Sequence, residues 1–211
     1  MNNSLDSLRD RERKKYDILY KDDSGYGSVN HGKNKLDLLV SLKPDSVIDV
    51  GCGDNALVED QNKMGIAGFG VDISSPDADI KAPAHSLPVK DQTYGYVTAF
   101  DVLEHLLPEE IDEVFREFKR VAKIGFMFTI SLRKSRKKVD PVTGKITRIP
   151  NLIFKQHHDV LDIEEEFALH QTIRTEEWWV SKINTVADIN YLENHKNFNL
   201  FVHGVFKKDM S

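Results

Sequence analysis

The sequence predicts an α/β fold built on a doubly wound, mostly parallel sheet. Short apolar runs alternate with helical segments between residues 46 and 132, a glycine turn follows the first run, and an aspartate lies at the end of the second. Strands that alternate with helices form parallel sheets covered by helices on both faces. Ligands of such sheets bind where the strands end, so functional residues are expected just after the strands.

Two polar segments precede the first predicted strand. Residues 1–24 are highly charged, which is typical of a solvated helix or a mobile arm. A glycine-punctuated loop follows and carries Tyr26 and His31. Apolar residues between positions 36 and 42 fit one face of a helix, and Pro44 predicts its end.

The alternation of strands and helices then begins. Apolar runs at 47–50 and 67–73, with a helical segment between them, predict a βαβ unit. Residues 96–100 predict a further buried strand, residues 108–123 an amphipathic helix, and residues 124–132 a strongly apolar strand.

Residues 133–170 interrupt this alternation. They contain the basic run 133–138, a hairpin-like stretch at 140–145, and His157 next to His158, so we interpret them as an insertion over the site. The remaining elements are expected to be a helix near 175–183 and strands near 186–191 and 199–207. A length of 211 residues favours one domain.

Composition excludes some classes of protein. A net charge of −5 argues against a protein whose main task is to hold a phosphate backbone. The one cysteine, Cys52, cannot form an internal disulfide, and neither an export signal nor a membrane-spanning apolar stretch is present. We therefore expect a cytoplasmic protein without membrane contacts; nothing in the sequence indicates an oligomeric state.

The glycine turn Gly51-Cys52-Gly53 fits two ligands. With the following residues it matches the G-x-G-x-x-A pattern of dinucleotide sites, and glycines let any nucleotide approach the next helix. Asp49, two residues earlier, favours a different ligand, because its carboxylate would repel a pyrophosphate and attract an ammonium or a sulfonium. Asp72, at the end of the second strand, can accept hydrogen bonds from both ribose hydroxyls of any adenosine-containing ligand.

Together these stretches resemble the class I S-adenosylmethionine-dependent methyltransferases, and in particular the type 11-like members. The similar segments are Val47–Gly53, Gly70–Asp72, Leu87–Val89 and Ala99–Leu106. The resemblance implies a Rossmann-like sheet of seven strands with an antiparallel last strand, 201–206, and an inserted lid after the fifth strand. It also implies S-adenosylmethionine as the cofactor.

The resemblance divides the chain and assigns the cofactor site. The parts are an N-terminal arm and lid, a cofactor-binding core, a substrate-side insertion, and a last helix with closing strands: 1–32, 33–132, 133–170 and 171–211. The residues implied to bind the cofactor are Asp49, Gly51, Cys52, Gly53, Asp72, Ile73, Ala84, His85, Asp101 and Val102. Asn55 replaces a glycine found in many members, and Pro83 or Ala84 stands where relatives place an aspartate that binds adenine, so backbone near Ala84 and His85 is expected to take that role.

Methyl transfer from a sulfonium needs alignment of the acceptor more than a protein nucleophile. His105, after the fourth strand and next to Glu104, is the candidate base for a hydroxyl acceptor. Candidates for substrate contact lie in the loops: Tyr26, His31, His157, His170 and Arg174. No metal is assigned, although Asp101, Glu104, His105 and one histidine of the insertion could ligate manganese or cobalt better than magnesium, as in some related enzymes.

The predicted function is methyl transfer to a small-molecule or sugar- or nucleotide-linked acceptor, with oxygen favoured over nitrogen. One alternative is a nucleic-acid methyltransferase of the RNA type. One form of this hypothesis includes a bound metal ion that assists methyl transfer. The Asp/Asn-Pro-Pro-aromatic motif of enzymes that methylate base amino groups is absent after the fourth strand. A second alternative is a non-catalytic S-adenosylmethionine-binding partner or sensor. For the cofactor itself, the competing hypothesis is the nicotinamide dinucleotide of an oxidoreductase.

Overall fold

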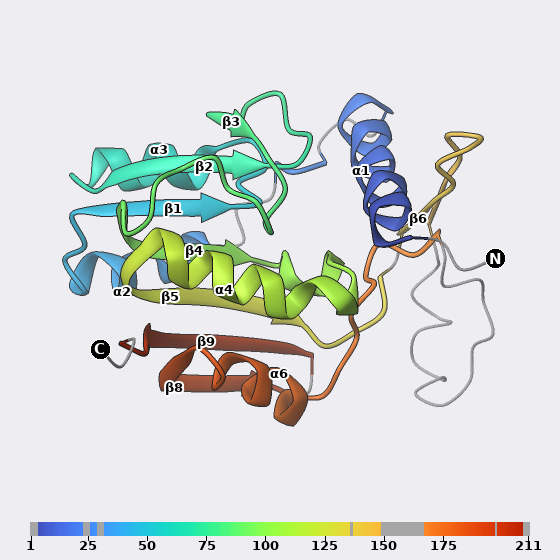
Figure 1. Ribbon diagram of the computed structural model, residues 1–211. Coiled ribbons are helices and arrows are strands. Elements are labelled where there is room, and N and C mark those ends of the chain that lie inside the picture. The colour runs from blue at the N-terminus through green and yellow to red at the C-terminus, as the bar shows by residue number, and fades with distance from the viewer. Residues whose placement is uncertain are drawn as a thin grey trace.

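Seven strands of the described chain form one sheet in the order β3-β2-β1-β4-β5-β9-β8 (Figure 1). The structure is a computed structural model that describes residues 4–22, 26–28, 32–135, 137–148, 167–196 and 198–208. The strands of this sheet are β1 Ser46–Val50, β2 Ala67–Asp72, β3 Ile80–Lys81, β4 Tyr94–Phe100, β5 Ala122–Ser131, β8 Ala187–His195 and β9 Asn199–Phe206. The helices are α1 Leu5–Asp22, η1 Lys33–Lys35, α2 Leu36–Ser41, α3 Ala56–Lys63, η2 Leu103–His105, η3 Pro108–Glu110, α4 Ile111–Val121 and α6 Glu176–Ile183.

The pairing of the strands confirms the predicted sheet. Strands β3, β2, β1, β4 and β5 pair in parallel, whereas β9 is antiparallel to both β5 and β8. The last strand therefore inserts between β5 and the edge strand β8. The two-residue strand β3 was not expected, because so short a segment carries no periodic pattern.

Helices cover both faces of the sheet, which explains why burial is continuous along the central strands β1 and β4. Ile48 packs in one apolar cluster with residues of α4 and α6, such as Phe115 and Trp179. Its neighbour Val47 packs in a second cluster with Leu39 of α2 and Leu57 of α3. Successive side chains of a strand point to opposite faces, so this division follows from the strand geometry.

Helix α1 lies beyond the carboxyl ends of β1 and β2 (Figure 1). Its charged sequence suggested a solvated helix, but Glu12, Lys15 and Leu19 are buried. The Lys15 ammonium donates to both Glu12 carboxylate oxygens at 2.9 Å and to the Ala168 carbonyl at 3.2 Å. A charged side chain can be buried when it is paired with an opposite charge in this way. Because the buried face of α1 carries charged residues, the sequence shows no apolar stripe that would predict its burial.

The part of the insertion that is described contains a two-stranded hairpin. Strands β6 Lys137–Val139 and β7 Ile146–Arg148 pair antiparallel, with Asp140 accepting hydrogen bonds in the turn between them. This agrees with the hairpin-like stretch predicted at 140–145. The described helices include none that is both long enough and apolar enough to cross a membrane.

Candidate active site

A cavity of about 1020 Å³ lies at the carboxyl ends of the strands, and residues of α1 line one wall of it. The sequence-predicted residues that line it come from β1 and β2, from the loops after β1, β2, β3 and β4, and from the segments before η1 and before α6. They are Asp49, Gly51, Cys52, Gly53, Asp72, Ile73, Ala84, His85, Asp101, Val102, Glu104, His105, Tyr26 and His170. The cavity thus brings together residues that lie far apart in the sequence.

The glycine turn after β1 is held in a conformation that few other residues adopt. The φ angles of Gly51 and Gly53 are 77° and 59°. A Cβ on Gly53 would lie 2.4 Å from the Gly27 carbonyl oxygen, so a side chain there would clash with backbone. Asn55, which replaces an expected glycine, also has a positive φ of 63°, a conformation that asparagine tolerates better than most residues. The turn therefore keeps its left-handed geometry without the third glycine.

Asp49 is a buried carboxyl group at the end of β1. It accepts a hydrogen bond of 2.5 Å from the Thr98 hydroxyl. Burial, reinforced by the negative charge of Asp72, raises the pKa of Asp49 to about 7. Burial disfavours the charged form when no cation is near, so this site favours a positively charged ligand.

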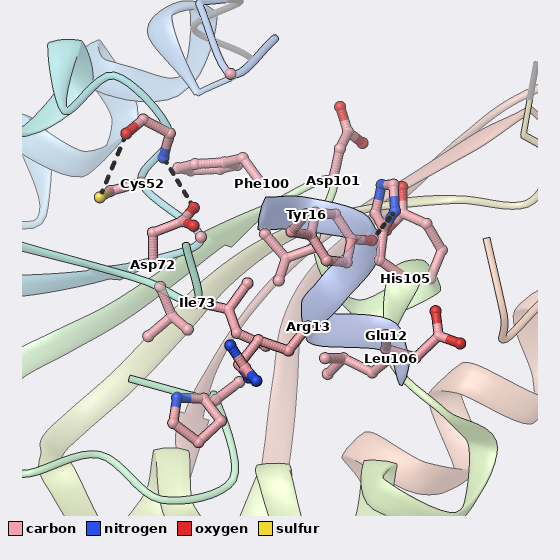
Figure 2. A pocket seen from close by; sticks show the side chains of 18 of the residues that line it. Glu12, Arg13, Tyr16, Cys52, Asp72, Ile73, Phe100, Asp101, His105 and Leu106 are labelled. Atoms are coloured by element: carbon pink, nitrogen blue, oxygen red, sulfur yellow. Dashed lines mark hydrogen bonds between the residues drawn. The ribbon is translucent and has the colours of Figure 1, made fainter. Parts of the chain in front are cut away.

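Both oxygens of the Asp72 carboxylate are hydrogen-bonded. The backbone N–H groups of Ser74 and Ser75 donate to Oδ1 at 2.9 Å each. The Gly53 N–H donates to Oδ2 at 3.3 Å (Figure 2), and the Tyr20 hydroxyl donates to the same oxygen at 3.0 Å. Helix α1 therefore reaches the carboxylate predicted to bind ribose.

Two histidines and a glutamate meet at the other end of the cavity. The His105 and His170 rings are 4.6 Å apart in an edge-to-face arrangement. The Tyr16 hydroxyl lies 2.8 Å from His105 Nδ1 (Figure 2), and the Arg133 carbonyl oxygen lies 2.5 Å from His170 Nδ1. Burial lowers the pKa of His170, which keeps its imidazole neutral near pH 7.

Glu104 is fully buried beside these rings. One carboxylate oxygen accepts a hydrogen bond of 3.0 Å from the Ser131 N–H, and Oε2 has no hydrogen-bond partner among the described residues. Burial, together with the negative charge of Asp101, raises the pKa of Glu104 well above its usual range. The Glu104 carbonyl accepts from the N–H groups of Gln171 and Thr172, which anchors the segment that carries His170.

The remaining predicted residues lie elsewhere or on the cavity wall. Arg174 is exposed, does not line the cavity, and has its guanidinium 5.6 Å from the centre of the Trp178 ring. His31 and His157 lie outside the described residues. His85 lies in the cavity wall with Nδ1 3.1 Å from a Glu110 oxygen, which also accepts from Arg9 of α1.

Tyr16 and Tyr20 were missed at the sequence level. Both line the cavity from α1 and contact predicted site residues. Their i, i+4 spacing places them on one face of the helix, which is the signal that could have identified them. Their hydrogen-bond partners, His105 and Asp72, come from loops and strand ends far away in the sequence. The spacing therefore predicts that the two tyrosines share a face of the helix, but it does not predict what that face contacts.

Comparison with known proteins supports the resemblance seen in the sequence. Residues 48–130 match the family model described as a methyltransferase domain. A search of curated proteins found no match.

Three solved structures illustrate the likeness in fold. The first is the Burkholderia thailandensis 1,6-didemethyltoxoflavin-N1-methyltransferase with bound 1,6-didemethyltoxoflavin and S-adenosylhomocysteine. Its sequence is 12% identical and its TM-score is 0.68, and the alignment covers 99% of this chain and 92% of that one. The methyltransferase in complex with the Haloferax volcanii Trm112 activator is 15% identical with a TM-score of 0.61, over 92% and 98%. An S-adenosylmethionine-dependent methyltransferase from Mesorhizobium loti is 16% identical with a TM-score of 0.54, over 82% and 98%.

The family match covers β1 to β5, the strands whose ends carry most of the cavity wall. The sheet order, the antiparallel β9 and the left-handed glycine turn agree with it. Residues 48–130 therefore match the methyltransferase-domain family, and the described chain has the fold of S-adenosylmethionine-dependent methyltransferases.

Proposed function

We propose that this enzyme transfers a methyl group from S-adenosylmethionine to a hydroxyl group of a small-molecule or sugar- or nucleotide-linked acceptor. The observation that carries the proposal is the chemical difference between the two ends of one cavity. One end holds buried carboxyl groups beside a glycine turn, and the other holds two imidazoles and Glu104.

The cofactor would occupy the end formed by β1 and β2. Asp72 would accept hydrogen bonds from the ribose hydroxyls, and the backbone of Gly51, Cys52 and Gly53 would border the methionine part. Asp49 would stabilise the ammonium and sulfonium charges. The adenine would lie near Ile73, Ala84 and His85, and Asp101 with Val102 would border it from the loop after β4.

The acceptor would approach from the side of His105. Its oxygen would attack the methyl carbon in line with the S–C bond, so that an O–C bond forms while the S–C bond breaks and neutral S-adenosylhomocysteine leaves. The hydroxyl proton must leave in the same event, and His105 is the group expected to draw it away, with Glu104 beside it. Tyr26 and His170 would contact the acceptor.

Several observations favour a small acceptor. Helix α1 covers the strand ends, and acidic side chains on it, including Asp6, Asp10 and Asp17, line the cavity. Basic side chains, including Arg9 and Arg13, line the cavity as well, so it is the net charge of −5 of the whole chain that disfavours a polynucleotide backbone. The Burkholderia enzyme of similar fold is named for the substrate 1,6-didemethyltoxoflavin, which is bound in its structure. We further propose that residues 1–32 and 133–170 form the walls around the acceptor.

Transfer of a labelled methyl group from S-adenosylmethionine into a fractionated host extract tests the proposal. We expect label in a low-molecular-mass product that mass analysis identifies as a methyl ether, and we expect His105→Ala to reduce its rate by at least 100-fold. Label in RNA or DNA would support the nucleic-acid alternative. Tight cofactor binding without transfer to any fraction would support the non-catalytic alternative.

A further inference from the structure

Glu104, His105 and His170 form a cluster with the composition of a metal site. Each offers one ligand atom, and these atoms all lie within 4.8 Å of one another. Ligand atoms around a four-coordinate ion at about 2.1 Å lie roughly 3.4 Å apart, so binding would shorten the longest separation by up to about 1.4 Å. Small side-chain rotations can supply that.

Each of the three side chains is fixed by a partner outside the cluster. The Arg133 carbonyl holds His170 through Nδ1, and the Tyr16 hydroxyl holds His105 through Nδ1. The Ser131 N–H holds one oxygen of Glu104. Metal-binding histidines in proteins are usually oriented in this way, with one ring nitrogen bonded to a carbonyl or hydroxyl and the other directed to the ion.

The unpaired oxygen of Glu104 points independently to a missing ligand. Glu104 is 0% exposed, and its Oε2 has no hydrogen-bond partner among the residues that the structure describes. Glu104 lines the cavity together with Asp101, so two carboxyl groups border this end. A buried carboxylate oxygen is costly unless a hydrogen-bond donor or a cation satisfies it.

We propose that Glu104, His105 and His170 bind one divalent transition-metal ion and leave coordination positions open for the acceptor. Two imidazoles with one carboxylate suit zinc, cobalt, manganese or iron(II) better than magnesium or calcium, which prefer oxygen ligands alone. This inference rests on the proposed function and deepens it. In the metal-bound form His105 would be a ligand and would no longer act as the base described above. The acceptor hydroxyl, bound to the ion, would have a lowered pKa, and its proton would pass to water.

Titration with Co²⁺ tests the site, because cobalt bound to imidazole and carboxylate ligands has characteristic visible absorption bands. The chelator-treated full chain is titrated with CoCl₂, and binding is followed by absorption and by calorimetry. We expect one ion per chain with a micromolar or lower dissociation constant. We expect Glu104→Gln and His170→Ala each to weaken binding at least 100-fold, which is more than the 10- to 100-fold typical of losing a residue that only orients a ligand.

A matched control separates this site from surface histidines. His195 is exposed on the edge strand β8 and lies 3.2 Å from a Glu193 oxygen, away from the cavity. His195→Ala should leave the cobalt spectrum and affinity unchanged. Equal affinity of the wild type, Glu104→Gln and His170→Ala for Co²⁺ would overturn the proposal, as would millimolar binding by all of them.

Measuring S-adenosylhomocysteine binding in the same samples distinguishes the two proposals. One outcome is that no cobalt site is found and that cofactor binding and methyl transfer persist after chelation. This would overturn the proposed metal site and leave the methyl-transfer function unchanged. A cobalt site in a chain that transfers no methyl group would support the metal and contradict the proposed function.

Discussion

Asp49 is the residue whose protonation should govern cofactor binding. Its carboxyl group is buried, and its pKa is raised to about 7 by burial and by the charge of Asp72. A sulfonium or ammonium ion interacts favourably only with the ionised form. Affinity for S-adenosylmethionine should therefore be highest above pH 7 and should fall up to about tenfold for each pH unit below it.

Calorimetric titration between pH 5.5 and 8.5 measures this dependence. Asp49→Asn should bind about 10- to 100-fold more weakly at pH 8, because the carboxylate charge is lost, and should show a flatter pH profile. If the asparagine variant keeps the slope of the wild type, another group controls the dependence and the role given to Asp49 is wrong.

The same raised pKa has a consequence for stability without cofactor. Between the unfolded pKa, with an ordinary value of 3.8, and the folded value of about 7, the folded protein binds a proton that the unfolded chain releases. Stability should therefore fall as pH rises through this window and then level off. Asp49→Asn should be more stable than the wild type at pH 8, on the order of 2–4 kcal/mol, and should lose this advantage near pH 4. Urea denaturation at pH 4 and pH 8 measures the difference in free energy of unfolding between the variant and the wild type and so checks its sign.

Tyr20 and the ribose should compete for Asp72. The Tyr20 hydroxyl donates to Oδ2 of that carboxylate at 3.0 Å, where a ribose hydroxyl is proposed to bind. Tyr20→Phe removes the competitor and should tighten binding of S-adenosylhomocysteine by about 3- to 10-fold, the scale of one hydrogen bond. Tyr191→Phe, on the exposed face of β8, is the control and should have no effect. Weaker binding by Tyr20→Phe would mean that Tyr20 contacts the cofactor directly.

At the scale of elements, α1 depends on a buried charge pair. Lys15 is 0% exposed and bonds Glu12 and the Ala168 carbonyl, so it ties α1 to the segment that carries His170. Its neighbour Lys14 is 54% exposed and pairs with Asp10 on the same helix. Lys15→Met should reduce the free energy of unfolding by about 2–4 kcal/mol, because the buried Glu12 carboxylate then loses its ammonium partner and keeps the ion pair with Arg11 at 2.9 Å.

Lys14→Met is the matched control, since loss of an exposed pair costs about 0–1 kcal/mol. Urea denaturation of both variants gives the comparison. The double variant Glu12→Gln/Lys15→Met should recover part of the loss, because the buried carboxylate charge is then gone and the partly exposed Arg11 can be solvated. Equal effects of the two lysine variants would contradict the burial of this face of α1.

At the scale of the whole molecule, the sheet could be predicted because its signals are local. Apolar runs indicate β1, β2, β4 and β5, and two glycines indicate the turn after β1. Chain connectivity then brings Asp49, Asp72 and Asp101 to one edge, because parallel strands end at the same side of a sheet. No knowledge of side-chain packing was needed for that half of the site.

The other half depends on contacts that no local pattern encodes. His105 could be placed at the correct edge from its position after β4, but its neighbours Tyr16 and His170 come from α1 and from the segment after the insertion. The basic residues at 133–138 suggested a role for their side chains, but it is the backbone carbonyl of Arg133 that lies next to His170 Nδ1. Arg174 was chosen for its loop position and lies instead beside Trp178.

Cofactor selectivity is a property of the whole cavity and can be tested on the intact protein. A ligand that binds only the folded state at 100 times its dissociation constant stabilises by about 2.7 kcal/mol, which should raise the melting temperature of a chain of this size by about 5–10 °C. S-adenosylhomocysteine should produce that shift, and Asp72→Ala should abolish it at the same concentration. NAD should produce none, because its pyrophosphate would approach the Asp49 carboxylate at the glycine turn, where like charges repel in a buried setting. Differential scanning fluorimetry with the two ligands decides the matter, and a shift with NAD alone would contradict the cofactor assignment made from Asp49.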